Sequence, residues 1–352
     1  HNLNVLTITF STFDIVIFIL FFSFLLRCRQ FYISNSKYDL LNINISSYSL
    51  FLYGLYLPLG LYFILRFLPL TQISLNYLNI LLLLGSIITF IFSILLIMSY
   101  NLKKMILYIT TAQFGILLML IGLKLYSAVV FHLYTSTISL LILTLSFGNI
   151  MSKLNNEQDI RKMGYLIIKC PFMFLFILIG FVSLLGIPFF SGFYSNKLIF
   201  FQFSLINIES YFLLSIYCYF YTFVVSYISF KIILIVFLGQ NNCNIHLYNK
   251  ISEGSYYLRL ILFVLSFIII FSGWYLNNLF SGYFGENLWR FVLLGDINFS
   301  INHNHDNNQW LFETRNIVCY IGIFLAFLNY LILPKLGYNL KFKNNKLFKY
   351  YL

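Results

Sequence analysis

The chain has 352 residues, of which 61% are apolar and 9% are charged, and its mean hydropathy is +0.87. Soluble domains carry about 25% charged residues, so this composition excludes a soluble globular protein. The net charge of +12 would suit a nucleic-acid partner, but the 22 Lys and Arg residues lie mainly in short connections and near the C-terminus. That placement is typical of a membrane protein, and we expect no nucleic-acid partner.

Nine apolar runs are long enough to cross a lipid bilayer. A spanning helix needs about 20 apolar residues, whereas a barrel strand alternates polar and apolar residues over about 10 positions. The runs here are continuous, so the sequence predicts an all-α polytopic membrane protein with about nine transmembrane helices. In chain order they cover residues 4–26, 48–68, 77–99, 105–123, 125–149, 166–204, 211–238, 257–277 and 315–333.

The sixth run, 166–204, is too long for one straight helix and too short for two helices with a loop. It contains Gly186, Pro188 and Gly192. Proline removes a backbone donor and glycine loosens a helix, so we interpret the run as one crossing made by a broken helix. Broken helices at membrane depth are tolerated where they line a cavity or are buried in protein, and in transporters they mark ion sites.

The positions of the basic residues support this choice. With nine crossings, 14 Lys and Arg residues fall on one side of the membrane and 4 on the other. If run 166–204 crossed twice, the division would be 10 to 8, which the positive-inside rule disfavours. The four on the minority side are Arg66, Lys124, Arg290 and Arg315.

Four ionisable residues lie inside the predicted crossings: Asp14, His132, Lys197 and Lys231. A charge at the bilayer centre costs at least about 2.5–3.5 kcal/mol, so such residues are candidates for function. Each also has a structural interpretation. Asp14 could pair with a cation on another chain, His132 could be a neutral histidine satisfied by nearby hydroxyls, Lys197 could extend to the interface, and Lys231 could pair with a carboxylate.

Metal and cofactor motifs are weak. The five cysteines lie far apart without a CxxC pair, and the sequence has neither a GxGxxG nor a Walker A pattern. Residues 303–306 (HNHD) lie in an Asn-rich polar stretch that is typical of a solvated loop. We therefore expect no cofactor or metal on this chain. Abundant Phe, Tyr, Ile, Asn and Lys, with three Ala and five Pro, indicate an A/T-rich gene, most plausibly an organellar one.

Residues 155–164 read NNEQDIRKMG, a distinctive acidic and basic loop, and further motifs flank it. Together they resemble NADH dehydrogenase subunit 5, the antiporter-like membrane subunit of respiratory complex I. The resemblance is clearest from about residue 60 to 240. Its other motifs are NLKK at 101–104, QFG at 113–115, FHL at 131–133, GIPF at 186–189, GFYS at 192–195 and SYISFKIILIVFLG at 226–239.

Several positions depart from the family pattern. Ser136 stands where the pattern has a second histidine, and Leu140 stands where it has a lysine. The lysine that follows the helix break is displaced by one place to Lys197, and Lys231 replaces an arginine. The N-terminal half-channel of the family is absent. We therefore expect a split or reduced subunit, with residues 1–68 as shortened upstream helices, 69–240 as the antiporter-like core, and 241–352 as two further helices and a basic tail.

The resemblance implies a membrane-arm subunit of a proton-translocating NADH:ubiquinone oxidoreductase in the mitochondrial inner membrane. Its redox cofactors would be on other subunits, and its partners would be other membrane-arm subunits, including a chain that supplies the missing N-terminal half. The proton path would use His132, Lys197, Asp14, Lys231, Thr135 and Ser136. Two alternatives stay open: a structural subunit with a degenerate, non-pumping channel, and an Mrp-type cation/proton antiporter.

Overall fold

The structure is a computed structural model that describes residues 75–205, 209–240, 253–281 and 310–332, together with Tyr62, Leu65, Asn242, Cys243 and Tyr248. The first two predicted crossings, 4–26 and 48–68, lie outside the described ranges except for Tyr62 and Leu65. Asp14, Arg66, Arg290 and the loop at 303–306 also lie outside them. The number nine therefore stays a prediction.

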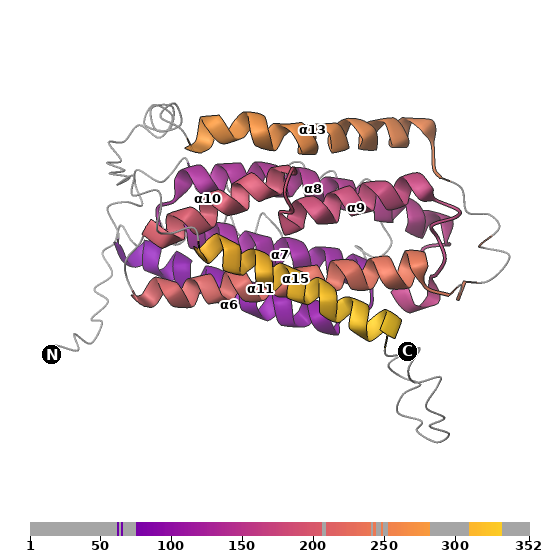
Figure 1. The fold of residues 1–352 in the computed structure, drawn as a ribbon, viewed down its shortest axis with the longest axis horizontal. Helices are drawn as coiled ribbons and strands as arrows, with labels where there is room; N and C mark the ends of the chain where they lie inside the picture. The colour runs from indigo at the N-terminus through magenta and orange to yellow at the C-terminus, as the bar shows by residue number, and fades with distance from the viewer. Residues whose placement is uncertain are drawn as a thin grey trace, which may run out of the picture.

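The described part of the chain is all-helical, in agreement with the predicted class. Six helices are long and apolar enough to cross a membrane. The helices run roughly parallel to the long axis of the molecule (Figure 1). In chain order they are α6 (Leu75–Met98), α7 (Leu102–Gly122), α8 (Tyr126–Lys153), α9 (Pro171–Leu185), α10 (Ser191–Leu205), α11 (Glu209–Ile232), α13 (Tyr256–Ser281) and α15 (Trp310–Phe327). Helix α11 continues as a π-helix over Ile233–Leu238, and α15 continues as one over Leu328–Ile332.

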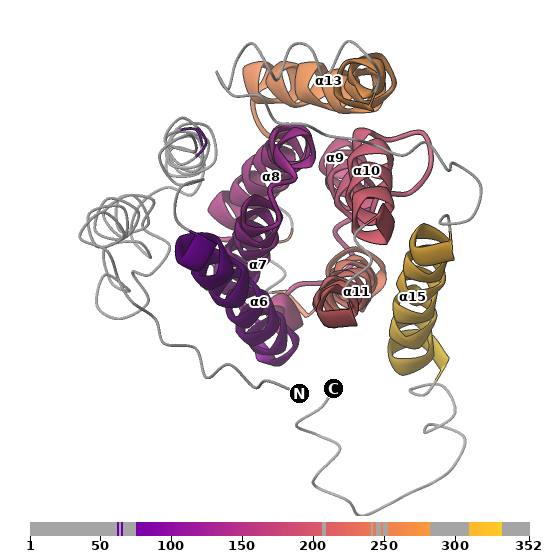
Figure 2. The same cartoon turned by 90° about the vertical axis from the view of Figure 1, so that its left-hand side faces the viewer.

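Helices α7, α8 and α11 form the buried centre of the bundle. At least 72% of the spanning window is buried in each of these three, against 39% in α6, 28% in α15 and 22% in α13. Seen end-on, α6, α13 and α15 lie on the outside of this centre (Figure 2). Helices α6 and α7 approach closely at Gly85 and Gly115. A Cβ added to Gly85 would lie 2.6 Å from Gly115 O, and a Cβ added to Gly115 would lie 2.7 Å from Thr89 Cγ2.

The predicted helix break is present. Helices α9 and α10 follow one another along a single line beside α8 (Figure 1), and the chain between them, residues 186–190, is not helical. Helix α9 ends in a Schellman motif, because Gly186 N donates to Ser183 O at 3.1 Å and Ile187 N donates to Val182 O at 3.2 Å. Gly186 has a φ of 67°, a left-handed conformation that glycine adopts without strain.

One helix boundary differs from the prediction in a way that matters for function. Helix α15 begins at Trp310, five positions before the predicted start at 315. Arg315 was assigned to a membrane surface, but it lies inside the helix and is 1% exposed. The polar sequence from Glu313 to Asn316 resembles a stretch at the membrane surface. The prediction therefore started the helix too late and left out its apolar first turn, residues 310–312.

Candidate functional site

His132 lies inside the bundle, on the first two turns of α8. It is 6% exposed, and its Nδ1 is 3.4 Å from Ser195 Oγ on α10. Thr135 Oγ1 lies 3.0 Å from the same Ser195 oxygen and 3.2 Å from the carbonyl oxygen of His132. Two of the predicted site residues, His132 and Thr135, are thus brought together by a hydroxyl that sequence analysis did not select.

The helix break positions this hydroxyl. Gly192, in the first turn of α10, faces Ser183 O so closely that an added Cβ would overlap the oxygen. The end of α9 and the start of α10 therefore pack without a side chain between them. Ser195 follows one turn after Ser191 and accepts the hydrogen bond from Thr135 on α8.

A small cavity of about 20 Å³ adjoins His132. It is lined by residues of α7, α8, α9, α10 and α11. Four of these residues carry a buried polar atom without a well-formed hydrogen bond among the described residues: Gln113 Oε1, His132 Nε2, Asn196 Nδ2 and Tyr221 OH. A cavity needs about 10–15 Å³ and two to four polar partners to hold a water molecule, so this cavity meets both requirements.

The next hydroxyls along α8 after Thr135 are committed to their own helix. Ser136, Thr137 and Ser139 each lie within 2.8–3.2 Å of the carbonyl oxygen three residues earlier. Ser136, the third predicted relay residue on this helix, is 4% exposed but has no such contact with another helix. A continuous file of hydroxyls along α8 is therefore not observed in the described residues.

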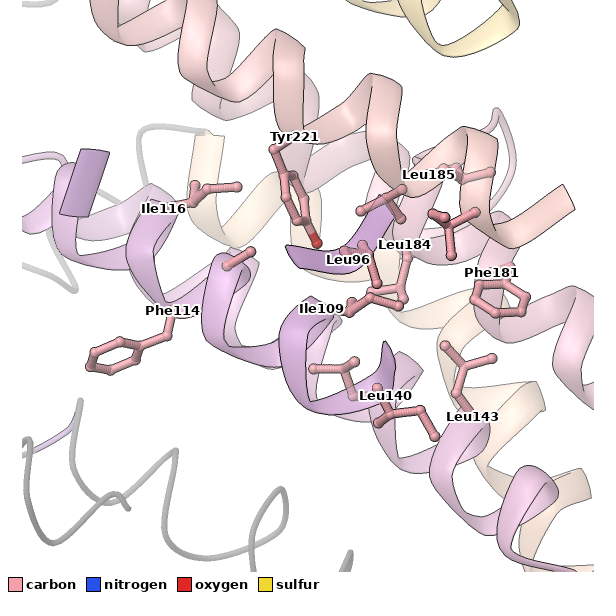
Figure 3. Close-up of a cluster of buried hydrophobic side chains, with 14 of the residues drawn as sticks. Leu96, Ile109, Phe114, Ile116, Leu140, Leu143, Phe181, Leu184, Leu185 and Tyr221 are labelled. Carbon is pink, nitrogen blue, oxygen red and sulfur yellow. The ribbon is translucent and has the colours of Figure 1, made fainter. Parts of the chain in front are cut away.

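Leu140 lies just over two turns beyond His132 and is surrounded by apolar side chains. Figure 3 shows it in a cluster with Ile109, Leu143, Phe181 and Leu184. Leu140 is 2% exposed, and the other four are also buried. We call these five residues the Leu140 cluster. It separates the His132 cavity from the end of the bundle where α8 ends and α9 begins.

The predicted lysines lie away from the cavity. Lys197 is on an exposed face of α10, and the inward position beside it is taken by Asn196. Lys231 is 2% exposed at the end of α11, where its Nζ lies 4.1 Å from the centre of the Tyr100 ring. The roles predicted for Lys197 and Lys231 in proton transfer stay predictions, and Asp14 lies outside the described residues.

The loop at 155–164 folds against the start of α7. Asn101 Nδ2 donates to Gln158 Oε1 at 2.8 Å, and Ile160 N donates to Tyr100 O at 3.1 Å. The guanidinium of Arg161 donates to both carboxylate oxygens of Asp159 and also lies 4.6 Å from the centre of the Tyr100 ring. Burial acts to raise the pKa of Asp159, but its hydrogen bonds with Arg161 and the charge of Arg161 together hold this pKa below its usual value.

Arg315 is a further residue near the site that sequence analysis missed. Its guanidinium donates to Leu185 O and, at 3.4 Å, to Gly186 O, the two carbonyls where α9 ends. It also donates to Asn316 Oδ1 at 3.2 Å. No acidic side chain forms an ion pair with it in the described part of the chain. The sequence signal that could have revealed it is a long apolar run that contains one arginine. This run is recognised only when the helix is taken to begin at Trp310.

Comparisons with known proteins agree on a family. The model of the NADH:quinone oxidoreductase/Mrp antiporter transmembrane family matches residues 2–226. Proteins named NADH-ubiquinone oxidoreductase chain 5 are similar: that of Chondrus crispus is 33% identical over 65% of this chain and 35% of its own length. That of Acanthamoeba castellanii is 28% identical over 83% of this chain and 43% of its own length. The chain therefore spans less than half the length of these relatives.

A solved structure shares the fold. A chain in the structure of the Mrp complex from Dietzia sp. DQ12-45-1b superposes with a TM-score of 0.60 at 15% sequence identity. The match covers 88% of this chain and 61% of the other. At this identity the likeness shows the fold alone.

Proposed function

Because the chain belongs to the NADH:quinone oxidoreductase/Mrp antiporter transmembrane family, we propose that it is a membrane-arm subunit of a proton-translocating NADH:ubiquinone oxidoreductase. In this proposal it works in the mitochondrial inner membrane beside other membrane-arm subunits, which complete the antiporter-like module. Reduction of the quinone takes place on other subunits. This chain carries no redox group and contributes a proton-binding site.

The proposed site is His132 with Ser195 and Thr135, at the edge of the small cavity. The observation that carries the proposal is the set of four buried polar atoms, from four different helices, that line a cavity able to hold water. Histidine changes its charge near neutral pH, so it can bind and release a proton under physiological conditions. A water molecule in the cavity would exchange that proton with His132 Nε2.

The proton path would open toward the end of the bundle where α7 ends and α8 begins. At that end Gln202 Nε2 donates to Ser127 Oγ at 3.1 Å, which joins α10 to α8 by polar groups. The neighbouring Gln202 Oε1 is buried without a well-formed hydrogen bond among the described residues. In the opposite direction the Leu140 cluster closes the path. The site would therefore exchange protons with one side of the membrane only.

A structural subunit without proton transfer is the second candidate. The observation that favours it is the dry packing of Leu140, at the position where the family pattern has a lysine. The outward position of Lys197 points in the same direction. An Mrp-type antiporter is less well supported, because the loop at 155–164 resembles the complex I subunit.

The substitution His132→Gln tests the choice between these candidates. In closed membrane vesicles that contain the assembled enzyme, protons moved per NADH oxidised should fall, while uncoupled NADH oxidation stays near the wild-type rate. Lys197→Ala is measured in parallel, because it removes the exposed positive charge of the neighbouring helix. A lower ratio in this variant would support the predicted role of Lys197 in the proton path, and an unchanged ratio would contradict it. An unchanged ratio in His132→Gln, with the enzyme fully assembled, would support the structural candidate.

A further inference from the structure

Arg315 is a buried charge on a helix that is otherwise mostly outward-facing. Only 28% of the spanning window of α15 is buried, yet Arg315 itself is 1% exposed. Its side chain extends from the outside of the bundle to the break between α9 and α10. Its partners there are backbone carbonyls, whereas the ion pairs of the described residues all involve other side chains.

The end of α9 explains why a cation is stable at this place. The last carbonyl groups of a helix have no partner within the helix and carry the negative end of its dipole. The Schellman bonds satisfy the carbonyls of Val182 and Ser183 but not the carbonyls that follow, among them those of Leu185 and Gly186. A guanidinium presents several donors in a planar fork, so Arg315 can hold both carbonyls at once.

Gly186 is the point where Arg315 meets the cavity. A Cβ at this position would lie 2.5 Å from Asn196 Nδ2 and 2.9–3.0 Å from the terminal nitrogens of Arg315. The guanidinium and the Asn196 amide therefore lie against the same glycine. Asn196 in turn lines the cavity that adjoins His132. Contacts thus run without a gap from α15, through the break, to the proposed proton site.

Helix α15 is itself fixed against α11, so the guanidinium has a rigid support. Tyr219 OH donates to Leu311 O at 3.0 Å, and Thr314 Oγ1 donates to Tyr219 OH at 3.0 Å. About two turns after Arg315, Gly322 packs so closely on Ser226 that an added Cβ would overlap its hydroxyl. These contacts hold Arg315 at a defined depth beside the break.

We infer that Arg315 is a positioning residue that clamps the break between α9 and α10 and thereby fixes Asn196 and Ser195 at the His132 site. Arg315 thereby couples the outer helix α15 to the break between α9 and α10. The effect on proton transfer rests on the function proposed above, whereas the clamp does not. The two parts therefore need separate measurements.

Amide hydrogen–deuterium exchange across residues 183–192 of the purified, assembled enzyme tests the clamp. In Arg315→Gln this segment should exchange about tenfold faster, because hydrogen bonds that involve a charged group are worth roughly a factor of ten or more. Arg315→Lys keeps the charge but can hold only one carbonyl well, so a rise of about threefold is expected. Arg259→Gln, which removes an arginine from the other outer helix α13, should leave the segment within about twofold of wild type.

An exchange rate within twofold of wild type in Arg315→Gln would overturn the clamp. If Arg315→Gln does not assemble, the exchange rate is measured in Arg315→Lys instead. A wild-type exchange rate in that variant would also overturn the clamp. The proton-to-NADH ratio is measured on the same samples and should fall in Arg315→Gln and recover in part in Arg315→Lys. Faster exchange together with an unchanged ratio in both Arg315→Gln and His132→Gln would leave the clamp standing and remove the proposed function.

Discussion

Two stretches of α8, around His132 and around Leu140, lie about 12 Å apart along the same helix. Both residues are almost fully buried, at 6% and 2% exposed. Around His132 there is a cavity, a hydroxyl contact from α10 and four buried polar atoms without well-formed hydrogen bonds. Around Leu140 the Leu140 cluster packs side chain against side chain (Figure 3).

The difference shows that burial alone does not make a proton site in a membrane protein. What distinguishes the His132 region is the set of polar groups that other helices bring to it. Ser195 and Asn196 come from α10, and they face inward because the chain breaks and restarts at Ser191. The Leu140 region faces the last turns of α9 before the break, where Phe181 and Leu184 are the inward residues. The break therefore marks the boundary between a polar and an apolar interior.

The largest expected effect comes from placing a charge in the apolar region. Leu140→Lys restores the residue type of the family pattern, but its ammonium would have no polar neighbour in the Leu140 cluster. The insertion cost of a lysine at the bilayer centre, about 3 kcal/mol, should appear as lost stability. Thermal unfolding of the purified enzyme and the amount of assembled complex would measure it.

Leu140→Met is the matched control for this change. It conserves volume and apolar character, and such swaps usually destabilise by less than about 1.5 kcal/mol. A Leu140→Lys enzyme that is as stable as wild type and moves more protons per NADH would contradict the conclusion that the Leu140 region is apolar and the His132 region polar. It would show that water reaches this part of α8.

The sequence predicts the helix break but not the direction in which its residues point. Gly186, Pro188 and Gly192 locate the break because backbone chemistry is local, and the observed gap at residues 186–190 agrees with them. Lys197 is different. A shift of one position turns a side chain by about 100° around the helix, which separates the exposed Lys197 from the buried Asn196. Helix α10 is apolar around most of its circumference, so its sequence pattern does not fix that rotation.

Arg315 and Ser195 show a second limit. Each matters because of a residue far away in the chain: Arg315 contacts carbonyls 129 and 130 positions earlier, and Ser195 contacts His132, 63 positions earlier. One sequence without its relatives contains no signal for such pairs. The neighbours of an isolated arginine become known only when the helices are placed side by side.

A smaller effect should follow from changing an aromatic ring that contacts two cations at the far end of the bundle. The charged groups of Lys231 and Arg161 lie 4.1 and 4.6 Å from the centre of the Tyr100 ring. Cation–π contacts contribute about 0.5–2 kcal/mol, so Tyr100→Leu should destabilise the enzyme by about 1–2 kcal/mol in thermal unfolding. This contact is independent of the polar and apolar parts of α8, so the proton-to-NADH ratio should stay unchanged.

Tyr100→Phe keeps the ring and removes the hydroxyl, which makes it the control. It should unfold at nearly the wild-type temperature. An equal loss of stability in the Phe and Leu variants would assign the effect to the hydroxyl instead of the ring. A lower proton-to-NADH ratio in Tyr100→Leu would place Lys231 in the proton path and extend the polar region past the Leu140 cluster.

The smallest expected effect concerns the solvent-facing loop at 157–163, where charges are paired in water and not in lipid. The pKa of Asp159 is held below its usual value by Arg161 against the opposing effect of burial. A lowered pKa stabilises the folded loop at pH values above the ordinary aspartate pKa of about 3.9, and this contribution is lost as the pH falls through the lowered value. Since the Arg161 side chain is 47% exposed, the contribution should stay below about 1 kcal/mol.

Amide exchange in this loop, corrected for the intrinsic effect of pH, would measure the contribution. Asp159→Asn should exchange slightly faster than wild type at pH 7, and the two should converge as the pH falls through the lowered pKa of Asp159. A difference that persists at low pH would mean that the hydrogen bonds of residue 159 hold the loop without the charge. Peptides around His132 and Leu140 should be unaffected at every pH, because the loop contacts α7 and the end of α11. A change in those peptides would show that the loop affects the interior of the bundle. The boundary between the polar and the apolar interior would then depend on the loop as well as on α9 and α10.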